Sequence, residues 1–316
     1  MPDRLPPLTA LRAFEAAARH MSFAKAAAEL FVTPAALSYQ IKQLEEHLET
    51  PLFRRLNRAV ELTDAGRALQ PGVTDGFTAL RQAVKQVAKL RNENELTITA
   101  GPAFTAKWLA PRFFRFADAH PELELRFVAT LRAMDFHRDG VDAAIRFGAG
   151  PPDDLYSEVL AEEWMTPVCT PSVAEQILRA NQLDVVPLLH DESIEMFDPA
   201  PDWKRWSELS GIGVDWTHGA HFSNADHVID VALEGGGVTL GRIVLCQRYL
   251  ESGRLVAPFK TAMWAGGQYR FVCPQGDESN PRICMLLSWL RDEIAHVRDL
   301  ADEFTFVGDR QGALVV

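Results

Sequence analysis

The residues of this sequence best suited to a specific chemistry lie between Thr33 and Lys42. Thr33 is typical of a helix N-cap, and Pro34 suits the first helical position because it lacks only an N–H group that has no partner there. One face of the helix that follows would carry Ala35, Ser38, Tyr39 and Lys42. Base edges in the DNA major groove are read by hydrogen bonds and small apolar contacts. The sequence therefore predicts a groove-reading helix, with Gln40 as a further candidate DNA contact.

A helix of this kind needs a core that holds it, and the neighbouring residues predict one. Its other face carries an apolar stripe at spacings of four, three and four, made of Leu37, Ile41, Leu44 and Leu48. Residues 22–45 predict two short helices joined by a tight turn, and an earlier amphipathic helix at 8–18 would complete a three-helix core. The alternative is an ordinary alanine-rich helical bundle, in which such pairs are also common.

Three arginines follow the helix pair. Residues 51–62 predict two short strands around a turn near Asn57, with Arg54, Arg55 and Arg58 on or beside the turn. A β-wing of this kind places guanidinium groups where they contact phosphates or enter the minor groove. A solvated surface is the alternative, but the position next to the helix pair favours DNA contact.

These features together resemble a LysR-type transcriptional regulator. Residues 5–66, which begin with the run LPPLTALRAFEAAARHMSF, are similar to the N-terminal domain of that family. The run is most similar to the subgroup that holds the glycine-cleavage-operon activator and the β-lactamase regulator. The resemblance covers essentially the whole chain. It implies a winged helix-turn-helix DNA-binding domain at 1–63, a linker and dimerisation helix at 64–92, and an effector-binding domain at 93–316.

The predicted linker helix carries a heptad-like apolar seam. The seam residues alternate in steps of four and three: Leu69, Val73, Phe77, Leu80, Val84 and Val87. A small winged domain cannot bury so long a seam, so we expect pairing with the same helix of a second subunit, as the resemblance also implies. Packing within one chain is the alternative. Pro71 falls inside the pattern and predicts a kink or a restart of the helix.

Length and charge limit the class of protein. The 316 residues are too many for one typical domain, and 47% of them are hydrophobic, which suffices for more than one core. Residues 1–92 carry a net charge of +4 and the rest −15, so the basic groups are concentrated where DNA contact is expected. No apolar run reaches the length of a membrane span and no signal peptide opens the sequence. We therefore expect a cytoplasmic protein without membrane contact.

Cysteine and histidine usage gives no sign of a metal, a cofactor or a catalytic site. Four widely spaced cysteines favour buried thiols over a disulfide or a metal site: Cys169, Cys246, Cys273 and Cys284. His218, His221 and His227 have no cysteine or close carboxylate cluster beside them, so we expect structural or surface histidines. No nucleophile–base pair is identifiable from spacing. We expect no metal, no cofactor and no enzyme activity.

After Glu95 the sequence alternates strands and helices, which predicts an α/β domain with ligand sites at the carboxyl ends of parallel strands. The predicted strands are 96–100, 123–130, 142–147, 165–169, 238–240 and 269–273. The predicted helices are 101–110, 171–180, 223–234, 245–252 and 281–298, with a further helix around Trp203 and Trp206. The resemblance implies a periplasmic-binding-protein-like domain with two subdomains, about 93–164 with 268–300 and about 165–267.

The cleft between these subdomains is the expected effector site. Backbone N–H groups at a helix start receive anionic groups, which favours residues 101–105. Residues 146–148 end a strand, and residues 222–225 begin a helix. The candidate effector contacts are Gly101, Ala103, Phe104, Thr105, Phe147, Gly148, Ser223, Asn224 and Tyr269. Capping or core packing is the alternative for each. Position 103 is Ala, which removes a hydroxyl from the expected ligand site, and the sequence does not identify the effector.

Two classes of function remain. The first is a ligand-responsive regulator that binds double-stranded operator DNA and a small-molecule effector, such as an amino acid or another small metabolite. It would act as a homodimer or homotetramer, with RNA polymerase as a further partner. The second is a solute-binding protein or small-molecule enzyme built on the α/β part. The second class leaves the wing arginines unexplained, so the sequence favours the regulator, without deciding between activation and repression.

Overall fold

The computed structural model describes residues 5–55, 60–89, 94–148, 150 and 154–309. The chain divides into two compact units, Met1–Arg91 and Asn92–Val316, and each has an apolar core of its own. Within the described ranges, no helix is both long enough and apolar enough to cross a membrane.

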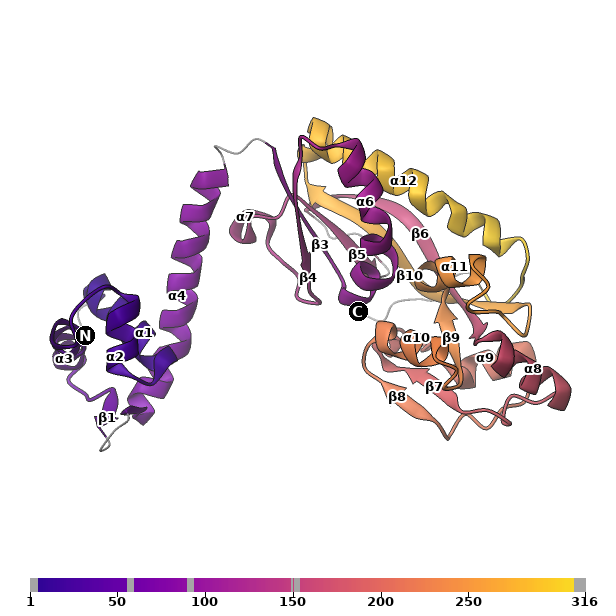
Figure 1. The fold of residues 1–316 in the computed structure, drawn as a ribbon, viewed down its shortest axis with the longest axis horizontal. Coiled ribbons are helices and arrows are strands. Elements are labelled where there is room, and N and C mark those ends of the chain that lie inside the picture. Colours follow the sequence, from indigo (N-terminus) through magenta and orange to yellow (C-terminus); the bar gives the residue numbers. More distant parts are fainter. Residues whose placement is uncertain (1–4, 56–59, 90–93, 149, 151–153, 310–316) are drawn as a thin grey trace. The chain divides into compact units, whose positions relative to one another are not determined.

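Three helices form the core of the first unit: α1 (Leu8–His20), α2 (Phe23–Glu29) and α3 (Pro34–His47) (Figure 1). Ala26 and Ala27 are fully buried, and their small side chains let α2 pack closely against α1 and α3. The Thr33 hydroxyl accepts a hydrogen bond from the N–H of Ala36 at 3.2 Å. The predicted helix pair, its N-cap and the third helix are thus confirmed.

An antiparallel wing of two strands follows α3. Strand β1 (Phe53–Arg55) pairs with β2 (Val60–Leu62), with Phe53 opposite Leu62. The turn, with Asn57 and Arg58, and the side chain of Arg55 lie outside the described residues. Thr63 ties the wing to the next helix, because its hydroxyl donates to the Pro51 carbonyl (2.7 Å) and accepts from the Gly66 N–H (3.1 Å). The predicted strand pair is confirmed.

Helix α4 (Asp64–Lys89) runs as one helix with Pro71 inside it. The prediction that the helix restarts at Pro71 is therefore wrong. Packing explains how the helix tolerates the lost N–H of proline, since Leu69, Val73 and Phe77 on the same segment contact the core of the first unit. The stripe thus packs within the chain over this half. Its other half remains exposed, with Leu80 at 51%, Val84 at 71% and Val87 at 59%.

The second unit is built on a mixed sheet that has nine strands within the described residues, in the order β4-β3-β5-β10-β6-β9-β7-β8, with β11 beside β10. The strands are β3 (Glu95–Ala100), β4 (Glu124–Ala129), β5 (Ala143–Gly148), β6 (Leu155–Val168), β7 (Leu188–Asp191), β8 (Ala220–Phe222), β9 (Val238–Arg242), β10 (Thr261–Pro274) and β11 (Thr305–Val307).

Helices cover this sheet, and α12, yellow in Figure 1, packs against β6. The α-helices are α5 (Pro102–Phe104), α6 (Ala110–Ala119), α7 (Phe136–Asp139), α8 (Pro171–Ala180), α9 (Trp203–Ser210), α10 (Ala225–Leu233), α11 (Ile243–Glu251) and α12 (Pro281–Ala301). A π-helical turn, η1 (Thr105–Leu109), joins α5 to α6, and short 3-10 turns lie at Glu192–Ile194 and Asp277–Ser279. The predicted helix around Trp203 and Trp206 is confirmed as α9.

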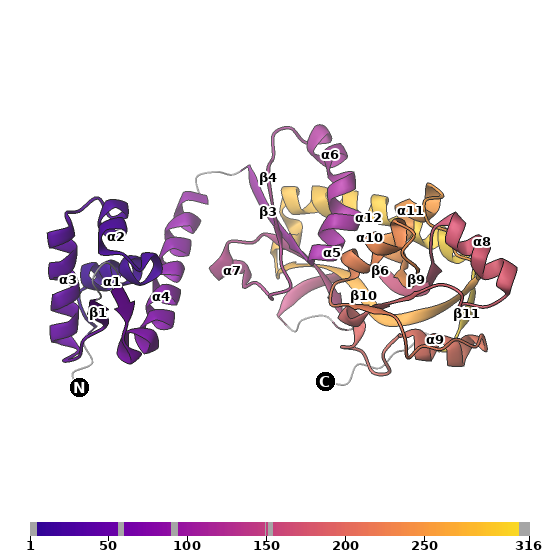
Figure 2. The same ribbon diagram turned by 60° about the horizontal axis from the view of Figure 1, so that its bottom comes forward.

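Two long strands, β6 and β10, pass through the middle of the sheet (Figure 2). On one flank β3, β4 and β5 run parallel, and on the other β7, β8 and β9 do so. The predicted parallel sheets are correct for these flanks but wrong for the centre, where β10 is antiparallel to β5 and β6. A chain that crosses between two halves and returns through the same layer must place its crossing strands in opposite directions. The strands predicted at 165–169 and 269–273 are parts of β6 and β10.

The close packing of Gly66 against the wing predicts that replacing this helical glycine with alanine lowers stability. In Gly66→Ala, the added Cβ would overlap the Leu52 carbonyl oxygen and the Leu62 side chain, so we expect a loss of about 1–3 kcal/mol in the free energy of unfolding. Gly76→Ala, in open space on the same helix, should instead raise it by up to about 1 kcal/mol. Urea unfolding of residues 1–92, followed by circular dichroism, measures both. Equal stabilities of the two variants would contradict the close packing of Gly66 against Leu52 and Leu62.

Candidate functional site

Helix α3 separates an apolar face from a polar one. Leu37, Ile41 and Leu44 are buried in the core of the first unit. On the other side, the predicted contacts Thr33, Pro34, Ala35, Tyr39 and Lys42 are exposed, and Ser38 and Gln40 are half-buried. Tyr39 is held in place by the Gln43 side-chain amide, which donates to its hydroxyl at 2.8 Å. The structure thus brings the predicted helix residues onto an accessible surface of one helix.

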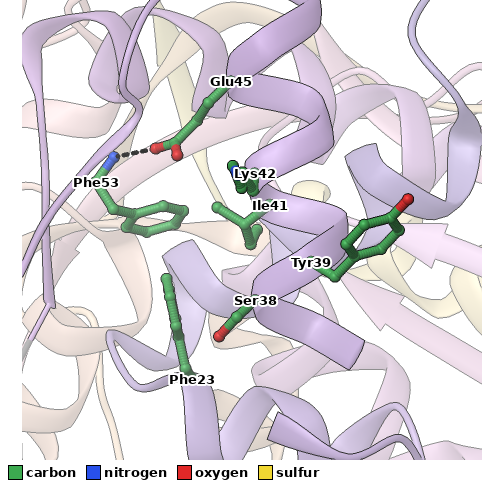
Figure 3. Close-up of a pocket in the computed structure, with 7 residues that line it drawn as sticks. All are labelled: Phe23, Ser38, Tyr39, Ile41, Lys42, Glu45 and Phe53. Atoms are coloured by element: carbon green, nitrogen blue, oxygen red, sulfur yellow. Dashed lines mark hydrogen bonds between the residues drawn. The ribbon is translucent and has the colours of Figure 1, made fainter. Parts of the chain in front are cut away.

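A groove of about 390 Å³ lies between α3 and the wing (Figure 3). It is lined by Phe23, Ser38, Tyr39, Ile41, Lys42, Glu45 and Phe53. The Glu45 carboxylate accepts hydrogen bonds from the backbone N–H groups of Leu52 (2.8 Å) and Phe53 (3.2 Å). Sequence reasoning did not select Glu45. This carboxylate fixes the first wing strand against α3, so it positions the wing relative to the polar face.

Of the three predicted wing arginines, the structure describes the side chain of one. Arg54 is exposed at the middle of β1, where its backbone pairs with Glu61. Arg55 pairs with Val60 through the backbone. Lys42, on the polar face of α3, lies 3.5 Å from Glu46, and both side chains are largely exposed. An exposed pair of this kind is weak, so Lys42 can exchange its partner for a phosphate or a base.

The second unit holds a cleft of about 450 Å³. Seven of the nine predicted effector contacts line it: Gly101, Ala103, Phe104, Phe147, Ser223, Asn224 and Tyr269. Thr105 and Gly148 do not. The Thr105 hydroxyl donates to the Gly101 carbonyl at 3.0 Å, so it is engaged in the helix start. The cleft lies at the carboxyl ends of β3 and β5, as expected for an α/β domain.

Two helix starts present polar groups to the cleft. The first backbone bond of the helical segment that begins at Pro102 joins the Thr105 N–H to the Gly101 carbonyl (2.9 Å), so the N–H groups of Ala103 and Phe104 precede it. At α10, Asn224 occupies the N-cap position without a side-chain cap bond. Asn224 thus lines the cleft without making the usual cap bond.

Sequence reasoning missed Arg242, which lines the cleft while only 6% exposed. Its Nε donates to Glu163 at 3.3 Å, and its Nη2 donates to the Tyr269 hydroxyl at 2.6 Å. The guanidinium carbon lies 3.9 Å from the centre of the Phe147 ring. Burial raises the pKa of Glu163 to about 7, although Arg242 and the Val244 N–H oppose the shift. Arg242 ends β9 directly before α11, so the rule of strand ends could have identified it.

Two of the histidines considered as metal ligands, His218 and His221, lie on the surface. His221 lies 3.0 Å from Glu192 and His218 lies 3.0 Å from Asp215, all with exposed or half-exposed side chains. Among the described residues, no group of three or more histidine, cysteine or carboxylate side chains could hold a metal ion. Three cysteines are buried as predicted, but Cys284 is exposed, because α12 turns that face to solvent.

Two protein-family models match this chain, one for each of its two units. The chain matches a model described as a bacterial regulatory helix-turn-helix protein of the lysR family over residues 8–67, and a LysR substrate binding domain over 90–295. It is 37% identical over 294 residues to the Glycine cleavage system transcriptional activator of Escherichia coli strain K12, covering 92% of this chain and 94% of that protein.

Two further comparisons point to a second named group. The chain is 36% identical over 260 residues to the HTH-type transcriptional activator AmpR of Citrobacter koseri, covering 82% of this chain and 89% of that protein. It also resembles the solved effector domain of the transcriptional regulator AmpR of Pseudomonas aeruginosa, with a TM-score of 0.53 and 27% identity. That structural match covers 66% of this chain and 99% of the other.

The Glu45 contact predicts that the wing depends on one carboxylate. Glu45→Ala leaves two backbone N–H groups without their acceptor, and we expect a loss of about 1–3 kcal/mol in the free energy of unfolding of residues 1–92. Glu45→Gln keeps an acceptor oxygen and should lose less. Glu46→Ala, the exposed neighbour, should change stability by less than about 0.5 kcal/mol. If denaturation gave the same stability for Glu45→Ala and Glu46→Ala, Glu45 would not be the residue that holds the wing.

Proposed function

The chain belongs to the LysR family of transcriptional regulators, and we propose that it binds operator DNA through α3 and the wing and changes its regulation when a small molecule occupies the cleft. As a LysR-type regulator it has a helix-turn-helix DNA-binding domain and an effector-binding domain. The observation that supports the DNA-binding surface best is the exposure of Ala35, Tyr39 and Lys42 on one face of α3, beside an exposed Arg54. This function is binding and requires no catalytic step.

Within this surface, we assign base reading to the helix and backbone contact to its surroundings. Ser38, Tyr39 and Lys42 offer donors to the acceptors of the major groove, and Gln40 adds an amide at its edge. Ala35 is small enough to contact a thymine methyl group. Thr33 and Pro34 lie at the N-terminus of α3, whose positive end favours a phosphate. The wing arginines, Arg54, Arg55 and Arg58, hold the DNA backbone.

The division of charge supports binding by more than one copy. The first 92 residues carry a net charge of only +4, while the rest carry −15, so a single DNA-binding domain should hold DNA weakly. LysR regulators form oligomers. We propose a homodimer in which the exposed half of the α4 stripe, Leu80, Val84 and Val87, meets its copy. Two such dimers would form a tetramer on the operator, with RNA polymerase as the next partner.

The cleft supports a role as a sensor. We assign effector contact to the seven predicted residues that line it, and a positioning role to Thr105 through its bond to Gly101. A ligand changes regulation only if it binds two arrangements of the oligomer with different affinity. The two relatives are named transcriptional activators, which favours activation as the response of this chain.

The DNA-binding surface predicts different outcomes for two substitutions. Footprinting of the DNA upstream of its own gene would first identify an operator. Arg54→Ala should then weaken binding to all DNA sequences and lower the slope of log affinity against log salt concentration by about one unit. Tyr39→Ala should instead change the preference among operator variants, because it alters base reading. Arg179→Gln, an equal charge change on α8, serves as the control. Affinities within about twofold of the unchanged protein for both variants would exclude this surface.

The α4 stripe predicts the state of assembly. Val84→Glu places a charge where burial between two subunits is expected, so a fragment of residues 1–92 should shift from dimer to monomer. Thr78→Glu adds the same charge on a different face of α4 and should leave the dimer intact. Sedimentation at tens of micromolar reports both, since dimers depend on protomer concentration. An unchanged fragment that is folded but monomeric would contradict the proposed seam.

A further inference from the structure

The cleft has a charge opposite to that of its surroundings. Residues 93–316 carry a net charge of −15. Yet the charged residues that line the cleft are Arg132, Arg146 and Arg242, and no aspartate or glutamate of the described residues lines it. Positive charge gathered in a concave site attracts anions and raises their local concentration. The cleft is therefore suited to a negatively charged ligand.

Two of the three arginines already have partners at the rim of the cleft. Arg132 is 64% exposed and lies 3.1 Å from the carboxylate of Asp139. Arg146 donates to the Met134 carbonyl at 3.2 Å, and its guanidinium carbon lies 5.4 Å from the centre of the Phe136 ring. Arg242 differs from both because it is almost fully buried on the floor, beneath a partly open cavity.

The guanidinium of Arg242 has donors to spare. Of its five N–H bonds, one is directed to Glu163 and one to the Tyr269 hydroxyl, and no described residue accepts from the other three. Tyr269 accepts at that contact, so its own hydroxyl proton is also available. Phe147, stacked on the guanidinium, fixes its plane. A rigid, desolvated guanidinium with an unused edge matches the two oxygens of a carboxylate.

Glu163 limits the positive charge of this site. Burial raises the pKa of its carboxyl to about 7, so it carries only part of a charge near neutral pH. The other titratable groups that act on this pair are Tyr269, Asp191 and Cys246. Lowering the pH from 8 to 6 protonates Glu163 and leaves Arg242 less neutralised. An anion in the cleft should therefore bind more tightly at the lower pH.

We infer that Arg242 binds a carboxylate of the effector, and that the effector carries a short apolar body without an ammonium group. This inference rests on the proposed function of the cleft as the effector site. The apolar body would lie against Leu131, Met134 and Met196, which line the cleft. An ammonium group would find hydroxyls and carbonyls there but no carboxylate, since none lines the cleft among the described residues. Arg242 thus selects a carboxylate, and the lack of an acidic residue among the described residues of the cleft lining selects simple acids over amino acids of the same carbon skeleton.

The test uses the full chain and three probes with one carbon skeleton, 4-methylpentanoate, 4-methylpentanamide and leucine. A fourth probe, 3-methylbutyl phosphate, carries a phosphate on the same branched alkyl end. Calorimetry should show the carboxylate binding at least about tenfold more tightly than the amide or leucine. In Arg242→Gln the preference for the carboxylate over the amide should disappear. Arg179→Gln makes an equal charge change on α8 and should keep it. Thermal unfolding followed by circular dichroism shows that each variant is folded, and operator binding measured in parallel shows that its DNA-binding domain is intact.

A second variant, at Glu163, should change the affinity for the carboxylate in the opposite direction. Glu163→Gln keeps an acceptor for the Val244 N–H but removes the counter-charge, so it should tighten carboxylate binding severalfold and abolish the rise in affinity between pH 8 and pH 6. A purely structural role of the pair would weaken binding in both variants. The inference is overturned if the amide or leucine binds as well as the carboxylate, if the alkyl phosphate binds better, or if no carboxylate binds at about 10 mM. In each case operator binding would leave the proposed function standing, whereas loss of operator binding by the unchanged protein would remove it.

Discussion

A buried arginine requires a partner, and the contact between Glu163 and Arg242 is the one around which the second unit is arranged. Glu163 lies on β6 and Arg242 ends β9, while Tyr269 on β10 and Phe147 on β5 hold the same guanidinium. One side chain therefore connects four strands from both sides of the crossing. Because Glu163 also accepts the Val244 N–H at the start of α11, the contact fixes the crossing and the floor of the cleft together.

The first unit meets the opposite requirement, since the face to which we assign DNA contact must stay exposed. The apolar stripe of α3 is buried against α1 and α2, and this orientation alone turns Tyr39 and Lys42 outward. The wing has too few residues to hold itself, so backbone groups of Leu52 and Phe53 are bound by Glu45, and Thr63 joins the wing to α4. A carboxylate next to a DNA-binding surface repels phosphates, but here its oxygen is occupied by N–H donors.

The linker helix combines both requirements in one element. The core of the first unit packs against Leu69, Val73 and Phe77. Among the described residues, the exposed part of the stripe consists of Leu80, Val84 and Val87. A proline is tolerated in the first half because tertiary contacts replace the missing backbone bond. The exposed second half is the surface that supports the proposed homodimer, in which a second DNA-binding domain would offset the strong acidity of residues 93–316.

The sequence by itself determined the elements whose signals are local. The cap at Thr33, the stripe from Leu37 to Leu44 and the strand–helix alternation after Glu95 each depend on neighbours a few residues away. The order of these local signals along the chain also identified the family. The antiparallel centre of the sheet was not predicted, because strand direction depends on which distant strands become neighbours. The charges at Glu158 and Glu163 in β6 likewise find their partners, Arg291 and Arg242, only in the fold. The floor of the cleft was missed for the same reason. Glu163 and Arg242 are far apart in the sequence, and only the tertiary structure pairs them, since a buried charge is tolerated where its partner is brought to it.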